Sequence, residues 1–231
     1  RRCEINFRFA NGVLLRRRSS RCLSASKSSF TAQVDRFRAV RVSSSHIRSN
    51  ERETSLYIHF PWCLKKCPYC DFNSHKMDAQ SVPHQAYADA IIDELTWRVA
   101  EAKDIGPLAS IFLGGGTPSL WEPLAIERVL NHVASLWPMK PGLEITAECN
   151  PSSLDRARSN ALKQAGINRL SIGVQSFDDR ELEYFGRLHS GVEALKSLDG
   201  ALATGLRVSA DLMFGAPVRT PEERVKDVIQ L

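Results

Sequence analysis

Beyond residue 55 the sequence alternates short apolar segments with amphipathic ones, five times over. The apolar segments, which we interpret as strands, are residues 56–60, 110–113, 143–147, 169–174 and 208–213. The intervening segments have helical periodicity: in residues 83–103, Tyr87, Ile91, Leu95 and Val99 recur every four positions. Strand–helix alternation predicts right-handed crossovers and a parallel sheet. Because the strands are apolar on both faces, we expect helices to cover the sheet.

The polar residues at the strand ends favour a barrel over a flat, doubly wound sheet. Cysteines follow the first strand, glycines the second, Glu148 the third and Gln175 the fourth, and Asp211 lies in the fifth. In a barrel the C-terminal ends of parallel strands meet at one mouth, whereas a flat sheet spreads them along a crevice. The expected fold is therefore an α/β protein with a barrel-like sheet and one site at its mouth.

Three of the six cysteines lie close together after the first strand, at Cys63, Cys67 and Cys70. Thiols this close on one loop suit a soft metal centre better than a disulfide framework. A structural zinc ion needs four ligands. The candidates for a fourth zinc ligand are His59, His75 and Cys149. An iron–sulfur cubane held by three thiolates instead keeps one iron open, and the spacing favours this interpretation, with zinc as the alternative.

The segment Gly114-Gly115-Gly116-Thr117-Pro118 ends the second strand. It is not a phosphate loop, because no Lys-Ser/Thr pair follows it. Three glycines allow close approach of a ligand to the backbone, and a tight turn alone rarely needs three. A charge such as Asp211 inside an apolar run requires a partner. Glu148, Gln175 and Arg187 are each compatible with ligand binding, and equally with a capping or surface role.

Charge divides the chain near residue 55. Residues 1–55 contain 13 Lys and Arg and 4 Asp and Glu, so of the totals of 31 and 26 the remainder holds 18 and 22. The basic character therefore belongs to an Arg- and Ser-rich leader, and nucleic acid is not an expected partner. Such a leader predicts a plastid or mitochondrial transit peptide. The alternatives are a disordered leader or translated upstream sequence, in which case the protein would be cytoplasmic. No apolar run approaches the ~20 residues of a transmembrane helix.

The motifs around the cysteines resemble the radical S-adenosylmethionine (SAM) superfamily, in which a C-x3-C-x2-C loop follows the first strand and GGGTP the second. The string from Tyr57 to Cys63, with Cys67-Pro68-Tyr69-Cys70-Asp71-Phe72-Asn73-Ser74-His75, is most similar to the HemW-type haem chaperones. The resemblance covers residues 56–231. It divides the chain into a leader, residues 1–55, and a radical SAM core, residues 56–231. It implies a partial (β/α)6 barrel preceded by a disordered basic tail. Because the sequence is expected to be a fragment, the sixth strand would lie beyond Leu231.

The resemblance also implies cofactors and their ligands. Cys63, Cys67 and Cys70 would hold a [4Fe–4S] cluster, and the amine and carboxylate of SAM would bind the open iron. The implied SAM contacts are Tyr57, Tyr69, Gly115, Gly116, Thr117, Glu148, Gln175, Arg187 and Asp211. The core is expected to be competent for reductive cleavage of SAM, with electrons from a ferredoxin, a flavodoxin or a reduced nicotinamide system. No catalytic residue is assigned.

Two functions in haem and porphyrin metabolism follow from the resemblance. One is a chaperone that binds haem as cargo and delivers it to recipient haem proteins. The other is an oxygen-independent coproporphyrinogen III oxidase, which would carry a further cysteine where this sequence has Phe72. The oxidase would also carry extra N-terminal sequence in the region where this chain has a leader. Both Phe72 and the leader therefore favour the chaperone. The residues capable of ligating haem are His59, His75, His189 and Cys149, and none of them is preferred. The family's His-Asn-x-x-Tyr-Trp motif would lie beyond Leu231.

Overall fold

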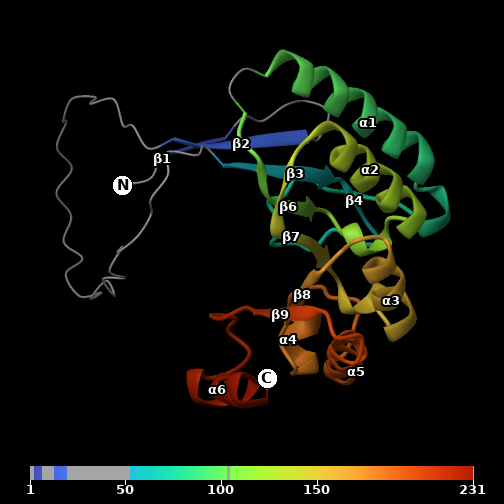
Figure 1. The fold of residues 1–231 in the computed structure, drawn as a ribbon. Coiled ribbons are helices and arrows are strands. Elements are labelled where there is room, and N and C mark those ends of the chain that lie inside the picture. Colours follow the sequence, from blue (N-terminus) through green and yellow to red (C-terminus); the bar gives the residue numbers. More distant parts are fainter. Residues whose placement is uncertain (1–2, 7–12, 20–52, 103–104, 231) are drawn as a thin grey trace.

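The structure, a computed structural model, describes residues 3–6, 13–19, 53–102 and 105–230 (Figure 1). Five strands pair in parallel, each with the next along the chain. They are β3 (Thr54–Phe60), β6 (Leu108–Gly115), β7 (Met139–Cys149), β8 (Arg169–Gln175) and β9 (Arg207–Leu212). The five predicted strands and their parallel order are therefore confirmed, and β7 begins four residues earlier than expected, at Met139.

Among the described residues, six α-helices connect or follow these strands. They are α1 (His84–Glu101), α2 (Pro123–Leu136), α3 (Arg156–Gln164), α4 (Asp179–Tyr184), α5 (Gly191–Leu202) and α6 (Pro221–Gln230). Helices α1, α2 and α3 lie along one side of the curved sheet (Figure 1). Alternate strand residues such as Leu56, Ile58 and Leu113 are buried in one apolar core with these helices. The intervening residues face the opposite, concave side of the sheet, which is largely polar.

Ser152 and Ser153 follow β7 but do not cap helix α3. Those serines lie in a 3-10 turn, η3 (Pro151–Ser153), in which the Asn150 side chain accepts a hydrogen bond from the Ser152 amide. The helix begins later, and the Asp155 carboxylate accepts a hydrogen bond of 2.6 Å from the Arg158 amide. Asp155 is therefore the N-cap, because the turn displaces the helix start along the chain.

Two short pairs of strands lie outside the parallel set. Strands β4 (Trp62–Cys63) and β5 (His75–Lys76) pair with each other and close the cysteine loop. In the leader, β1 (Cys3–Asn6) and β2 (Val13–Ser19) form an antiparallel pair, and β2 continues the sheet beside β3. These two strands differ from the expectation of a leader without regular structure. The rest of that expectation concerns residues outside the described ones, and the boundary near residue 55 stays a prediction.

Two further 3-10 turns flank the site, η1 (Ala79–Ser81) after the cysteine loop and η2 (Pro118–Leu120) after the glycines. Within the described part of the chain, none of the helices has both the length and the apolar character of a membrane-spanning segment.

Candidate functional site

The C-terminal ends of the parallel strands open on one cavity of about 150 Å³. All three clustered cysteines line it. So do eight of the nine expected SAM contacts, namely Tyr69, Gly115, Gly116, Thr117, Glu148, Gln175, Arg187 and Asp211. The sequence places these residues on five different strands or the loops after them. The structure thus brings together side chains that are more than a hundred residues apart, as expected for a barrel mouth.

Backbone hydrogen bonds hold the cysteine loop in place over this mouth. The His75 amide donates to the Pro61 carbonyl at 2.7 Å, and the Met77 amide donates to the Cys63 carbonyl at 2.9 Å. Within the loop, the Lys66 ammonium donates to the carbonyls of Phe72 and Ser74, each at 3.2 Å. The three thiols are free and partly buried. The loop therefore presents its sulfur atoms from a backbone that is fixed at both ends.

Each of the three sulfur atoms lies near a polar hydrogen. The Thr117 hydroxyl donates to Cys63 Sγ at 3.4 Å, and Arg187 Nη1 donates to Cys67 Sγ at 3.5 Å. Cys70 Sγ lies 3.8 Å from the Ser74 hydroxyl. Burial raises the pKa of the Cys63 thiol, and the hydrogen bonds from Thr117 and Ser74 oppose that rise. Donors of this kind stabilise thiolates, the form in which cysteine binds iron.

Three free thiols line the same cavity. In the described part of the chain, no three His, Cys, Asp or Glu side chains converge as ligands of a single metal ion. A cubane needs no such convergence, because each thiolate binds a different iron atom. The cavity beside the thiols leaves room for a further ligand on an open iron. The three free thiols beside this cavity are compatible with the expected iron–sulfur cubane, and zinc remains the alternative.

The glycine turn is required by the packing of the protein itself. A Cβ on Gly116 would lie 2.6 Å from the Trp62 carbonyl oxygen and 2.8 Å from that of Phe60. Gly115 has a φ of 107°, and a Cβ there would lie 2.3 Å from the His59 ring. The Gly116 and Thr117 amides donate to the Phe60 and Trp62 carbonyls. The glycines thus join β6 to the start of the cysteine loop, and their exposed side still lines the cavity.

Two carboxylates line the cavity. Glu148 Oε2 accepts a hydrogen bond of 3.0 Å from the Gly115 amide, and Asp211 Oδ2 accepts one of 3.1 Å from the Ser171 hydroxyl. Burial raises the pKa of Glu148, the Gly115 hydrogen bond opposes this, and the charge of Asp211 raises the pKa further. Asp211 is exposed on β9, the last strand of the described sheet, and the Ser171 hydroxyl is the partner that a charge in an apolar run requires.

Arg187 joins the cysteine loop to strand β8. Its Nη1 lies 3.3 Å from the Tyr69 hydroxyl, and its Nη2 donates to the Gly173 carbonyl at 2.7 Å. The Tyr69 ring meets Phe185 edge to face at 5.6 Å. Burial raises the pKa of Tyr69 to about 12, although the charge of Arg187 opposes the rise. Tyr69 is therefore a neutral hydroxyl that is held at the wall of the cavity.

Tyr57 is the one expected SAM contact that does not line the cavity. Its ring is stacked on Phe112 at 6.0 Å, beside Gly114. Its hydroxyl lies 3.2 Å from His59 Nδ1, and His59 Nε2 lies 2.7 Å from the Asn73 carbonyl oxygen. Because a carbonyl only accepts, His59 carries its proton on Nε2 and accepts from Tyr57. The pair therefore links the concave face of β3 to the cysteine loop.

The structure separates the four residues considered as haem ligands. Both ring nitrogens of His59 are engaged. Cys149 is buried, and burial raises the pKa of its thiol to about 12. His189 is buried and hydrogen-bonded to the Val174 carbonyl. His75 is exposed on β5.

Sequence reasoning missed several residues that line the cavity, among them Ser74, Asn150 and Ser171. Ser171 had a detectable signal, because it alternates with Gly173 and Gln175 on one face of β8, with the period of two that a strand requires. Ser74 had none, because its position depends on how the loop folds back on Cys70.

Comparisons with known proteins indicate the family to which the chain is similar. Residues 57–230 match the model of the radical SAM superfamily. The chain is 43% identical over 177 residues to the heme chaperone HemW of Escherichia coli, covering 76% of this chain and 46% of that protein. It is 38% identical over 184 residues to the mouse radical S-adenosyl methionine domain-containing protein 1, mitochondrial, covering 79% and 41%. The chain thus spans less than half the length of these curated relatives.

A solved structure is similar as well. The radical SAM enzyme coproporphyrinogen III oxidase (HemN) of Escherichia coli superposes with a TM-score of 0.68 at 25% identity, covering 78% of this chain and 41% of that one. The similarity extends over the parallel sheet and its helices, so it supports a partial barrel.

Proposed function

The chain belongs to the radical SAM superfamily, and we propose that it carries the radical SAM core of a HemW-type haem chaperone. The observation that supports this most directly is the 43% identity to the Escherichia coli haem chaperone, against 25% to coproporphyrinogen III oxidase. In this proposal the complete protein binds haem as cargo and passes it to recipient haem proteins. Residues 1–55 form a leader and residues 56–231 belong to the core.

We assign a [4Fe–4S] cluster to Cys63, Cys67 and Cys70, and SAM to the cavity beside them. When bound, the cluster and SAM together supply one-electron reductive chemistry. The chain contributes donors toward the sulfur atoms, from Thr117 and Arg187, and these stabilise the negative charge of the thiolates. Electrons would come from a ferredoxin, a flavodoxin or a reduced nicotinamide system.

The remaining cavity residues would bind and orient SAM. The backbone of Gly115 and Gly116 is accessible at the cavity wall. Glu148, with its raised pKa, and Asp211 offer acceptors suited to an amine or to ribose hydroxyls. Tyr69, Thr117, Gln175 and Arg187 offer donors. Tyr57 would act on the SAM site indirectly, because its ring lies beside Gly114 and does not line the cavity.

Coproporphyrinogen III oxidation is the second candidate, and the solved radical SAM oxidase with a similar fold favours it. Phe72 weighs against this reaction. It occupies the position of that family's further cysteine, lines the cavity and is 61% exposed. A phenyl ring offers neither a thiol nor a proton at this place.

We also infer an organellar location. The Arg- and Ser-rich composition of the leader supports it, and relatives in mouse, cow and zebrafish are named as mitochondrial. Mitochondrion is the location that these names favour over plastid.

One experiment separates the two candidate functions. The full-length protein is reconstituted anaerobically and titrated with haem while the Soret absorbance is followed. In parallel, the reduced protein is incubated with SAM and coproporphyrinogen III. We expect saturable haem binding and no decarboxylated product. Decarboxylation would establish the oxidase, and failure to bind haem would contradict the chaperone.

A further inference from the structure

Strand β8 is irregular immediately before Gln175. Its pairing with β9 shifts in register between Ile172 and Gln175. Gln175 has a φ of 72°, and it is the only residue other than glycine with positive φ in the described part of the chain. Backbone of this kind is strained for a residue with a Cβ, and it persists only where the surroundings fix it. Since Gln175 lines the cavity, the strain lies at the site itself.

Side chains from one short segment hold the irregular part of β8. Arg187 Nη2 donates to the Gly173 carbonyl at 2.7 Å, and His189 Nε2 lies 3.0 Å from the Val174 carbonyl oxygen. The register shift removes Val174 from the pairing with β9, so its carbonyl needs another donor. His189 supplies that donor from a position where it is only 4% exposed.

The protonation state of His189 follows from its surroundings. Its Nε2 faces a carbonyl oxygen, which accepts and does not donate, so the proton must reside on Nε2. Nδ1 is buried and has no hydrogen-bond partner in the described structure. Burial lowers the pKa of His189 to about 4, so the ring is neutral near pH 7. The side chain is therefore a fixed neutral donor.

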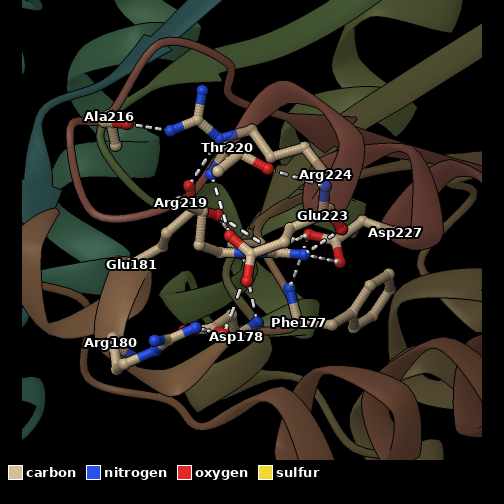
Figure 2. Close-up of polar contacts among 11 residues, drawn as sticks. Phe177, Asp178, Arg180, Glu181, Ala216, Arg219, Thr220, Glu223, Arg224 and Asp227 are labelled. Carbon is tan, nitrogen blue, oxygen red and sulfur yellow. Dashed lines mark hydrogen bonds and ion pairs between the residues drawn. The ribbon is translucent and has the colours of Figure 1, made fainter.

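The residue after Gln175 is held by groups other than His189. Figure 2 shows two of these groups, Glu181 and Asp227. Ser176 is fully buried, and its hydroxyl lies 2.7 Å from Glu181 Oε2 and 3.1 Å from Asp227 Oδ2. The Phe177 amide donates to the same Asp227 oxygen at 3.4 Å. Helices α4 and α6 thus fix the chain on the C-terminal side of Gln175, and the His189 contact fixes it on the N-terminal side.

We propose that His189 is a positioning residue for the SAM site: by holding the Val174 carbonyl it fixes the backbone that directs the Gln175 amide into the cavity. The Gln175 amide nitrogen would lie 2.8 Å from a Cβ on Gly173, so the side chain folds over that glycine. The inference rests on the proposed SAM site, and it adds a residue that does not itself line the cavity.

A double-mutant cycle tests whether His189 acts through Gln175. His189→Phe keeps a ring of similar size without a donor, whereas His189→Gln keeps an amide donor near the position of Nε2. Each is made in the wild-type protein and in Gln175→Ala, which removes the amide. The full-length proteins are reconstituted, and SAM affinity is measured by calorimetry, with iron content and unfolding temperature measured in parallel.

We expect His189→Phe to weaken SAM binding about tenfold, the effect of one lost buried hydrogen bond. His189→Gln should restore affinity to within about twofold of the wild type, and His189→Phe should add little in the Gln175→Ala background, because coupled residues are not additive. Equal losses in both backgrounds, or no rescue by His189→Gln, would overturn the proposal. If the wild type holds iron and binds SAM, such a result leaves the proposed function standing.

A second measurement needs no substitution. In the wild-type protein labelled with ¹⁵N-histidine, the His189 ring should show the tautomer protonated at Nε2, and its resonance should shift when SAM saturates the reconstituted protein. A His189 signal that SAM leaves unchanged, or that reports a proton on Nδ1, contradicts the positioning role even if His189→Phe fails to fold.

Discussion

Arg187 lies beside Cys67, with Nη1 at 3.5 Å from the sulfur atom, although 120 residues separate the two in sequence. Arg187 follows α4, and Cys67 lies on the loop after β3. A guanidinium at this distance stabilises negative charge on the sulfur, as a thiolate bound to iron requires. The contact also joins two neighbouring parts of the barrel mouth, because the same guanidinium holds the Gly173 carbonyl of β8.

The cysteines of the cavity should therefore differ in their contribution to iron binding. Cys67→Ala removes a thiol that faces a cation, and we expect it to abolish stable iron incorporation on anaerobic reconstitution. Cys149→Ala is the matched control: this buried thiol donates to the Ala147 carbonyl, and burial raises its pKa to about 12, so it stays protonated. Iron and sulfide content after gel filtration measures both. Wild-type iron in Cys67→Ala would rule out the assigned cluster.

The glycine turn should tolerate no side chain at Gly116. Gly116→Ala places a methyl group against the backbone of Phe60 and Trp62, which overpacks the junction of β6 with the cysteine loop. We expect its unfolding free energy to fall by about 3 kcal/mol and its iron content to fall with it. Gly142→Ala serves as the control. Its Cβ meets nothing within 4 Å, so only its φ of 71° is strained, at a cost of about 1 kcal/mol. Urea unfolding compares the two, and equal losses would contradict the packing argument.

The fold was predictable because its signals are local. Apolar runs of strand length alternate with helical periodicity, and β3, β6, β8 and β9 begin and end within two residues of the predicted bounds. The site was predictable because parallel strands bring their C-terminal ends together. Glu148 and Cys67 thus share one cavity without any sequence signal that links them directly.

Other features depend on three-dimensional packing that no local pattern records. Tyr57 was expected at the cavity. Stacking on Phe112 and the contact with His59 instead hold its ring beside Gly114, where it does not line the cavity. Asp211 lies among apolar residues in sequence, and its partner, the Ser171 hydroxyl, comes from the neighbouring strand β8. The role of His189 depends on a register shift in β8, and sequence periodicity does not encode such a shift.

Glu148 should make stability depend on pH in a predictable direction. Its pKa is raised in the folded protein, chiefly by burial and further by Asp211. Between the ordinary carboxyl pKa and the raised pKa of the folded state, the folded protein binds more protons than the unfolded one. The unfolding free energy therefore falls as pH rises through this range. Glu148→Gln removes this pH-dependent loss of stability. We expect the variant to match the wild type at acid pH, to be more stable than it near neutrality, and to bind SAM more weakly.

Urea unfolding of the metal-free protein at a series of pH values measures this difference. Asp178→Asn is a control of opposite sign. The hydrogen bond from the Arg180 side chain lowers the pKa of Asp178, so this variant should be less stable than the wild type near neutrality, with the difference vanishing at acid pH. A Glu148→Gln difference that does not change with pH would contradict the assigned burial of this carboxyl group.

The ion pairs that Arg219, just before α6, makes with α4 and α6 offer the last prediction (Figure 2). Arg219, 5% exposed, pairs with Asp227 at 2.9 Å and with Glu181 at 3.1 Å. Arg219→Met would leave a buried carboxylate without its main partner, so we expect the unfolding free energy to fall by about 3 kcal/mol. Because Ser176 contacts the same carboxylates, SAM affinity should fall as well. Arg180→Met is the control: Arg180 pairs with Asp178 at 2.8 Å but is 65% exposed, so water screens the contact and the unfolding free energy should fall by less than about 1 kcal/mol. Equal effects of the two substitutions in urea unfolding would show that burial does not set the strength of these pairs.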